Sequence, residues 1–123
     1  MLEEKLKELK AEETVWIIYI GIIILSFYSN CLERRYFIDN DLESKENYRK
    51  TLIFIFSILI IVYLYFLKDA YDSIKKLTPY DTTEKKNLNY LSFIGSLLIA
   101  ISGFIFLYIA IKDEDLDVEI AFN

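Results

Sequence analysis

Three stretches without a single charged residue constrain this chain more than any other feature of its sequence. They cover residues 14–32, 51–67 and 87–111 and hold 19, 17 and 25 residues. A helix that crosses the hydrocarbon core of a bilayer needs about 20 mostly apolar residues, with a range of about 17–25. All three stretches fall within that range, so the sequence predicts an integral membrane protein with three spanning helices.

The helices are expected to continue beyond these stretches. We predict helices over residues 2–36, 44–77 and 82–112, followed by an acidic tail over residues 113–123, all within one domain of 123 residues. The second helix is expected to stop at Thr78-Pro79, because Pro lacks an amide donor and restricts the residue before it. Asp81 is then expected to cap the third helix, with Glu84 completing a capping box.

The predicted fold is an all-α, up-down-up bundle of three transmembrane helices with a short stalk on the N-terminal side. Leu2, Leu6 and Leu9 recur at helical spacing and are expected to pack inside the stalk. The second helix carries a similar row out of the membrane, formed by Leu67, Ala70, Ile74 and Leu77. The alternative for residues 1–13 is a free amphipathic helix on the membrane surface.

Charge and residue types narrow the function. None of the three stretches contains Asp, Glu, Lys, Arg or His, the usual marks of ion pathways and proton relays. This argues against a pump, a secondary transporter or an intramembrane hydrolase. With no His and one Cys, the sequence offers no catalytic set, no metal site and no cofactor site, so we expect a protein that is not an enzyme. No segment is basic enough to bind nucleic acid.

Small residues line one face of the predicted third helix. Ser92, Ser96, Ala100 and Gly103 follow each other at spacings of 4, 4 and 3. Such a face lets two helices approach closely and gain packing and hydroxyl hydrogen bonds. We expect it to mediate helix packing within the protomer or between protomers of a homo-oligomer. A pore lined by hydroxyls is the alternative.

The acidic tail has an alternating pattern. Its apolar side chains are separated by single residues: Leu116, Val118, Ile120 and Phe122. This period favours an extended strand, which could pair with residues 36–38 or with a protein partner. A disordered acidic tail is the alternative.

Basic residues favour one orientation in the membrane by a small margin. With three spans, the N-terminal segment and the second loop share one side and carry 3 and 5 basic residues. The other side carries 5 in the first loop and 1 in the tail. The positive-inside rule then predicts a multi-pass protein of the cell membrane with a cytoplasmic N-terminus. Basic residues at the ends of the first two stretches argue the other way.

These observations predict a small membrane scaffold or accessory subunit that self-associates through its helices. Its partners would be the lipid bilayer, further copies of the chain and a protein bound at the tail. The alternative is a homo-oligomeric pore that permeabilises the membrane. In layout, a short chain with three spans and charged ends resembles some phage holins and small membrane-bound immunity proteins, although no residue motif is shared and the tail here is acidic.

Overall fold

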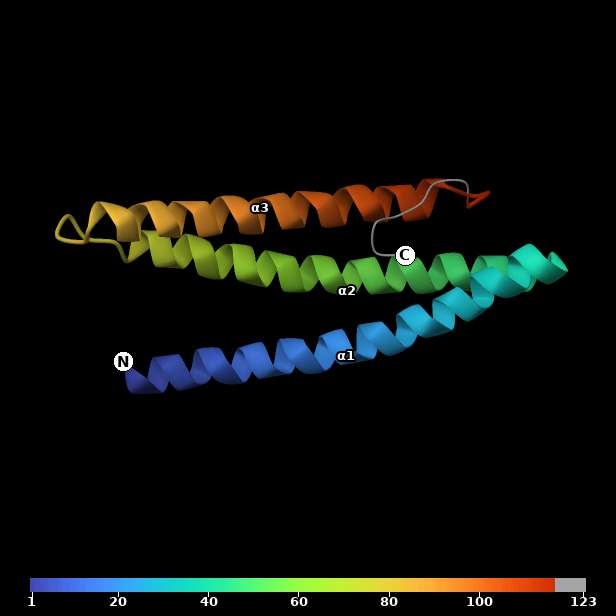
Figure 1. Cartoon of the computed structure of the whole chain (residues 1–123), viewed down its shortest axis with the longest axis horizontal. Helices are drawn as coiled ribbons and strands as arrows, with labels where there is room; N and C mark the ends of the chain where they lie inside the picture. The colour runs from blue at the N-terminus through green and yellow to red at the C-terminus, as the bar shows by residue number, and fades with distance from the viewer. Residues whose placement is uncertain (117–123) are drawn as a thin grey trace. The chain divides into compact units, whose positions relative to one another are not determined.

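The computed structural model describes residues 1–116, and this part of the chain is all-α. Three helices follow one another, α1 (Leu2–Asp39), α2 (Leu42–Lys75) and α3 (Thr83–Lys112) (Figure 1). Each is long and apolar enough to cross a membrane, as in a multi-pass membrane protein. No strand occurs within residues 1–116. The predicted fold class, all-α with three long apolar helices, is confirmed.

The helices extend beyond the charge-free stretches, as expected. Helix α1 begins at Leu2, well before residue 14, and α2 continues to Lys75, beyond residue 67. The apolar row on the α2 extension includes Ala70, which is buried, and Leu67 and Ile74, which are half-buried; Leu77, also half-buried, lies two residues beyond the end of α2 at Lys75, so the predicted helix end at residue 77 is wrong. By contrast, the row predicted to pack inside the stalk is exposed on α1, with Leu2, Leu6 and Leu9 exposing 72%, 55% and 46% of their surface, so the predicted packing is not seen at these residues.

Helix α1 runs three residues further than the predicted end at residue 36. Residues 36–38 are helical, so the strand considered for them is wrong. No Gly or Pro interrupts this region, and the helix stops only at Asn40, whose φ of 54° and ψ of 36° are left-handed. Asparagine adopts this conformation at helix C-termini more readily than most residues do.

Helix α2 begins at Leu42, two residues before the predicted start, because Asp41 precedes it. The Asp41 carboxylate accepts a hydrogen bond from the Glu43 amide at 3.1 Å and one from the Ser44 hydroxyl at 2.8 Å. The Asp41 carbonyl accepts from the Lys45 amide at 3.1 Å. The bond to the Glu43 amide satisfies a backbone donor that a helix leaves unpaired in its first turn, and the Ser44 bond holds the Asp41 carboxylate in place.

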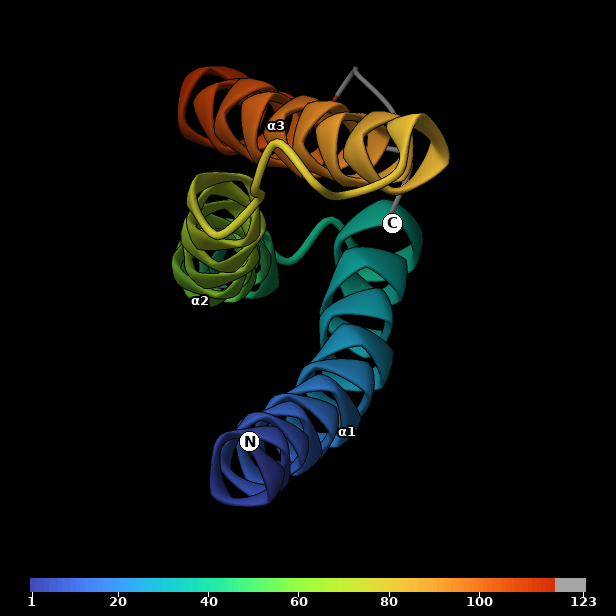
Figure 2. The same ribbon diagram turned by 90° about the vertical axis from the view of Figure 1, so that its left-hand side faces the viewer.

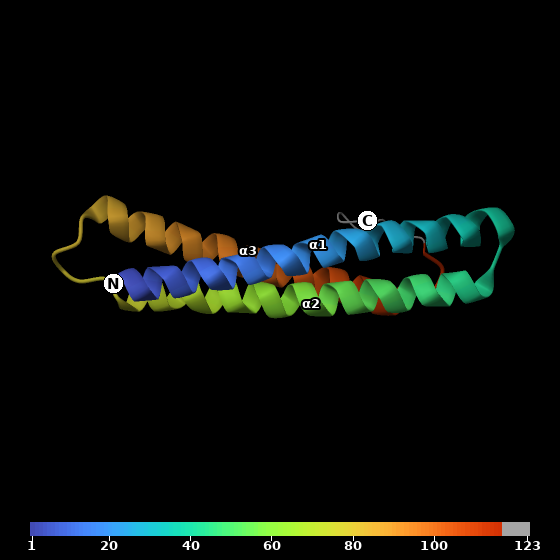
Figure 3. The same ribbon diagram turned by 90° about the horizontal axis from the view of Figure 1, so that it is seen from below.

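The described residues group into two units, 1–55 and 56–116, and α2 contributes to both. In the first unit, α1 and the start of α2 form a hairpin joined by residues 40–41, the short turn visible in Figures 1 and 3. The Lys45 ammonium lies 5.2 Å from the centre of the Tyr36 ring across this hairpin. The buried residues of this hairpin near the turn are Ser29, Leu32, Ser44, Tyr48, Leu52 and Ile55.

In the second unit, α3 runs antiparallel to the remainder of α2, as Figure 1 shows. Two ring pairs fix the alignment: Tyr71 with Phe93, whose centroids are 6.1 Å apart, and Phe56 with Phe106, at 5.9 Å. Gly103 lies between these levels. Residue 68 of α2 is therefore level with approximately residue 96 of α3. The connection between the two helices, over residues 76–82, faces the viewer in Figure 2.

Candidate functional site

The predicted small-residue face of α3 is divided in the structure. Ala100 and Gly103 are buried, with Ala100 exposing 3% of its surface. A Cβ atom added to Gly103 would lie 3.1 Å from Tyr63 Cδ2 and 3.2 Å from Ile60 Cγ1, both on α2. Because these distances are shorter than comfortable van der Waals contact, the glycine lets α2 and α3 approach closely at this point. This part of the face therefore packs within the protomer.

The other members of the face are more open. Ser92 is exposed and Ser96 is half-buried. Gly95, on the flank of the row, has no neighbouring atom within 4 Å of an added Cβ. These positions leave room for another helix or for lipid. Association between protomers through Ser92 and Ser96 remains a prediction.

The tail lies mostly outside the described residues. Val118, Ile120 and Phe122 are not described, and the predicted strand at these positions is untested. Leu116 is described, and its φ of 58° lies in the left-handed region. The extended conformation predicted for Leu116 is therefore wrong at that residue, because a strand needs negative φ. The preceding helix, α3, ends at Lys112, and the amide of its C-cap residue, Asp113, donates to the Ile109 carbonyl at 2.8 Å.

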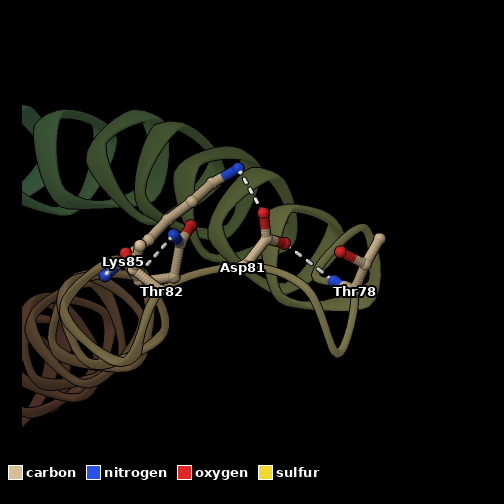
Figure 4. A network of polar contacts seen from close by, with 5 residues as sticks. Thr78, Asp81, Thr82 and Lys85 are labelled. Carbon is tan, nitrogen blue, oxygen red and sulfur yellow. Dashed lines mark hydrogen bonds and ion pairs between the residues drawn. The ribbon is translucent and has the colours of Figure 1, made fainter.

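A polar network organises the connection between α2 and α3 (Figure 4). The Asp81 carboxylate accepts from the Thr78 amide at 2.7 Å and from the Lys85 ammonium at 3.1 Å. The predicted capping role of Asp81 is wrong: the N-cap is Thr82, whose hydroxyl accepts from the Lys85 amide at 3.1 Å. Thr78 bonds to Asp81 instead of continuing the helix, and Pro79 favours extended backbone before it, so α2 ends at Lys75.

The two loop aspartates differ in pKa from an ordinary carboxyl. The hydrogen bond from the Thr78 amide, helped by Lys85, lowers the pKa of Asp81. The hydrogen bond from the Ser44 hydroxyl is the main cause of the lowered pKa of Asp41, to which the charge of Arg35 also contributes. Both carboxylates are thereby held in the ionised form that accepts these bonds. Their hydrogen bonds come from groups in the connection between α2 and α3 and in the first turns of these two helices.

An open groove on α1 is lined by Ile23, Ser26, Phe27 and Asn30. The Ser26 hydroxyl donates to the Ile22 carbonyl at 2.8 Å, so this hydroxyl is already satisfied within its own helix. The groove is therefore mainly apolar, with the exposed Asn30 at one end. Within residues 1–116, no three His, Cys, Asp or Glu side chains are grouped so that they could hold a metal ion.

Comparisons with protein-family models, curated proteins and solved structures find no match for this chain. The functional argument therefore depends on the residues and their geometry.

Two structural determinants were missed by the sequence reasoning. Asp41 caps α2, and the Asn-Asp pair that forms the turn was a local signal for it, since both residue types favour turns and caps. Ser29 is fully buried in the first unit, and its hydroxyl donates to the Ser26 carbonyl at 2.8 Å. Its sequence position alone does not reveal this burial, because nearby Ser26 is chemically identical and only half-buried.

Proposed function

We propose that the protein is a small, non-enzymatic membrane scaffold or accessory subunit. It self-associates through its helices in the bilayer and presents its acidic tail to a protein partner. The observation that carries this proposal is the openness of α3. Only 17% of the most apolar 18-residue segment of α3 is buried within the chain. The remaining surface is available to lipid and to other helices.

Small residues on that surface support association between copies. Ser92 and Gly95 lie on the exposed part of α3, and Gly95 has open space beyond its Cα. In lipid, close approach at such residues adds dispersion contacts and hydrogen bonds, which replace the hydrophobic driving force available in water. An exposed glycine on an otherwise apolar helix fits this role.

The test compares oligomer size in lipid nanodiscs for two glycine variants. Gly95→Leu is expected to reduce the oligomer while the protomer stays folded, because its own chain leaves the space free. Gly103→Leu serves as the contrast, since it disturbs the packing of α2 and α3 inside the protomer. An unchanged assembly in Gly95→Leu, or a wild-type protein that is monomeric throughout, would contradict self-association through this surface.

The tail is tested separately with a purified candidate partner or with crosslinking in the native membrane. One variant replaces the apolar set, Leu116, Val118, Ile120 and Phe122, with Ser. Its matched control replaces Asp117 and Glu119 with Asn and Gln. Loss of the partner in the first variant and retention in the second supports recognition by the apolar side chains. Retention in both removes the tail from the proposal.

A membrane-permeabilising pore is the second candidate, and ion flux separates the two. Liposomes containing a scaffold are expected to retain an encapsulated ion-sensitive dye, whereas a pore releases it. Rapid release that depends on protein concentration would replace the scaffold proposal with the pore.

A further inference from the structure

Four basic residues border the hydrocarbon-facing stretches in the α1–α2 hairpin. Arg34 and Arg35 follow the apolar stretch of α1 after one intervening residue, Glu33. Arg49 and Lys50 directly precede the apolar stretch of α2. All four belong to the first unit, in which the two helices are joined by a two-residue turn.

The hairpin geometry brings the two pairs to nearly the same depth. Arg34 and Arg35 lie five and four residues before the end of α1 at Asp39, while Arg49 and Lys50 lie seven and eight residues after the start of α2. At about 1.5 Å per residue, the depths of the two pairs differ by only about 5 Å. The headgroup region on each side of a bilayer is about 5–7 Å thick, so one layer accommodates all four side chains.

The acidic residues of the hairpin are mainly further from the bilayer. Asp39, Asp41 and Glu43 lie at the turn, beyond the arginines. Closer to the hydrocarbon are Glu33, which is half-buried, and Glu46, which pairs with Lys50 at 3.7 Å. That pair is about 70% exposed on both sides, so it competes only weakly with another anion.

The two arginines of α1 are the most available members of the group. Arg34 and Arg35 are both exposed, and within residues 1–116 neither forms an ion pair, although the charge of Arg35 also acts on the Asp41 carboxylate at the turn. A guanidinium group donates two parallel hydrogen bonds to a phosphate and is more weakly hydrated than an ammonium group. Arginines beside a hydrocarbon layer are therefore well suited to lipid phosphates.

We propose that Arg34, Arg35, Arg49 and Lys50 form a belt that binds the phosphate groups of anionic phospholipids. We assign the lipid headgroup as the ligand of this belt rather than free phosphate, because the four side chains lie where the spanning stretches of both helices end. This inference is independent of whether the protein acts as a scaffold or as a pore.

The experiment measures bound phosphatidylglycerol by native mass spectrometry after reconstitution of the full chain in mixed phosphatidylcholine and phosphatidylglycerol vesicles. Arg34→Gln with Arg35→Gln is expected to lower the preference for phosphatidylglycerol by about five-fold for each arginine, the effect of one basic side chain at an anionic surface. The matched control, Lys5→Gln with Lys7→Gln, removes the same charge from exposed positions at the other end of α1 and is expected to leave the preference unchanged.

Several outcomes would overturn the proposal. They are an unchanged preference in the arginine variant, an equal loss in the lysine control, and displacement of the lipid by inorganic phosphate at the same concentration as the headgroups. Arg34→Lys with Arg35→Lys keeps the charge and is expected to retain most of the preference. If the glutamine variant fails to fold, the same measurement is made on the wild-type protein at increasing salt concentration. Added salt is expected to weaken the preference for phosphatidylglycerol, and a preference that does not change with salt would contradict the proposal.

Discussion

At the residue scale, two aspartates order the connections between the helices of this protein. Asp41 accepts hydrogen bonds from the first turn of α2, and Asp81 connects Thr78 to Lys85 across the second connection (Figure 4). Each carboxylate accepts a backbone amide that has no helical partner, Glu43 for Asp41 and Thr78 for Asp81. The connections are therefore ordered by specific acceptors, and their order should depend on the charge of these two groups.

The first prediction concerns pH and Asp81. The folded pKa of Asp81 is lowered from its ordinary value of 3.8. Its contribution to stability is therefore present above that value and lost as pH falls through the lower, folded pKa. Protection of the Thr78 amide from hydrogen exchange, corrected for the intrinsic rate, is expected to fall below about pH 4.

Two variants check the assignment of this effect. Asp81→Asn should already have weak protection of the Thr78 amide at neutral pH and little further change on acidification. Asp69→Asn removes an exposed carboxylate on α2 and should behave like the wild-type protein. A pH response that persists in Asp81→Asn would assign the effect to another group.

At the scale of the elements, α2 and α3 are matched along their length by a few contacts. Gly103 lies against Ile60 and Tyr63, between the levels of the two aromatic pairs. A helix pair in lipid gains little from apolar character alone, because the lipid tails are equally apolar. Close packing at positions such as Gly103 therefore contributes much of the stability of the α2–α3 pair.

The second prediction tests how much the close packing at Gly103 stabilises the α2–α3 pair. Gly103→Leu is expected to destabilise the α2–α3 pair by about 1–3 kcal/mol, because the added side chain overpacks a tight contact. The measurement is the free energy of unfolding in a mixed-micelle titration with SDS. Gly95→Leu adds the same side chain where no atom lies within 4 Å and should change the unfolding free energy of the protomer by much less. An equal loss of unfolding free energy in both variants would contradict a stabilising role for the tight contact between Gly103 and Tyr63.

Some of these elements were predictable from the sequence, and some were not. The three helices followed from charge-free stretches, because hydrocarbon admits few other structures of that length. The helix ends depended on single side chains, and Thr82 competed with Asp81 for the same capping role, with both residue types suited to it. The contacts of α3 were less predictable, since lipid-facing and helix-facing sides are both apolar. Only the small size of Ala100 and Gly103 pointed to the packed side.

At the scale of the whole molecule, three spanning helices fix which connections share a side of the membrane. The N-terminus and residues 76–82 should lie on one side, with the Asn40 turn and the tail on the other. The sequence favours a cytoplasmic N-terminus. The proposed belt of basic residues lies at the opposite end of the spanning stretches, on the side of the Asn40 turn.

The third prediction tests this topology by labelling single cysteines in intact cells, in a Cys31→Ser background. Cysteines at Glu4 and Tyr80 are expected to share one accessibility, cytoplasmic by the positive-inside rule, and a cysteine at Asn40 the opposite one. Tyr80 is a suitable position because it is 97% exposed. Opposite accessibilities for Glu4 and Tyr80 would mean that one of the first two helices does not cross, whereas labelling of both from outside would reverse only the orientation.

The alignment of α2 with α3 also makes the protein responsive to bilayer thickness. The charge-free stretch of α3 is eight residues longer than that of α2, about 12 Å of helix. A thick bilayer that covers Leu88 and Leu91 would bring Lys68 and Asp69 into the acyl chains, whereas a thin bilayer that leaves those charges in water would uncover the leucines. The apolar stretches of α2 and α3 therefore match bilayers of different thickness. Membranes of different thickness should favour different depths of the same helical pair in the bilayer.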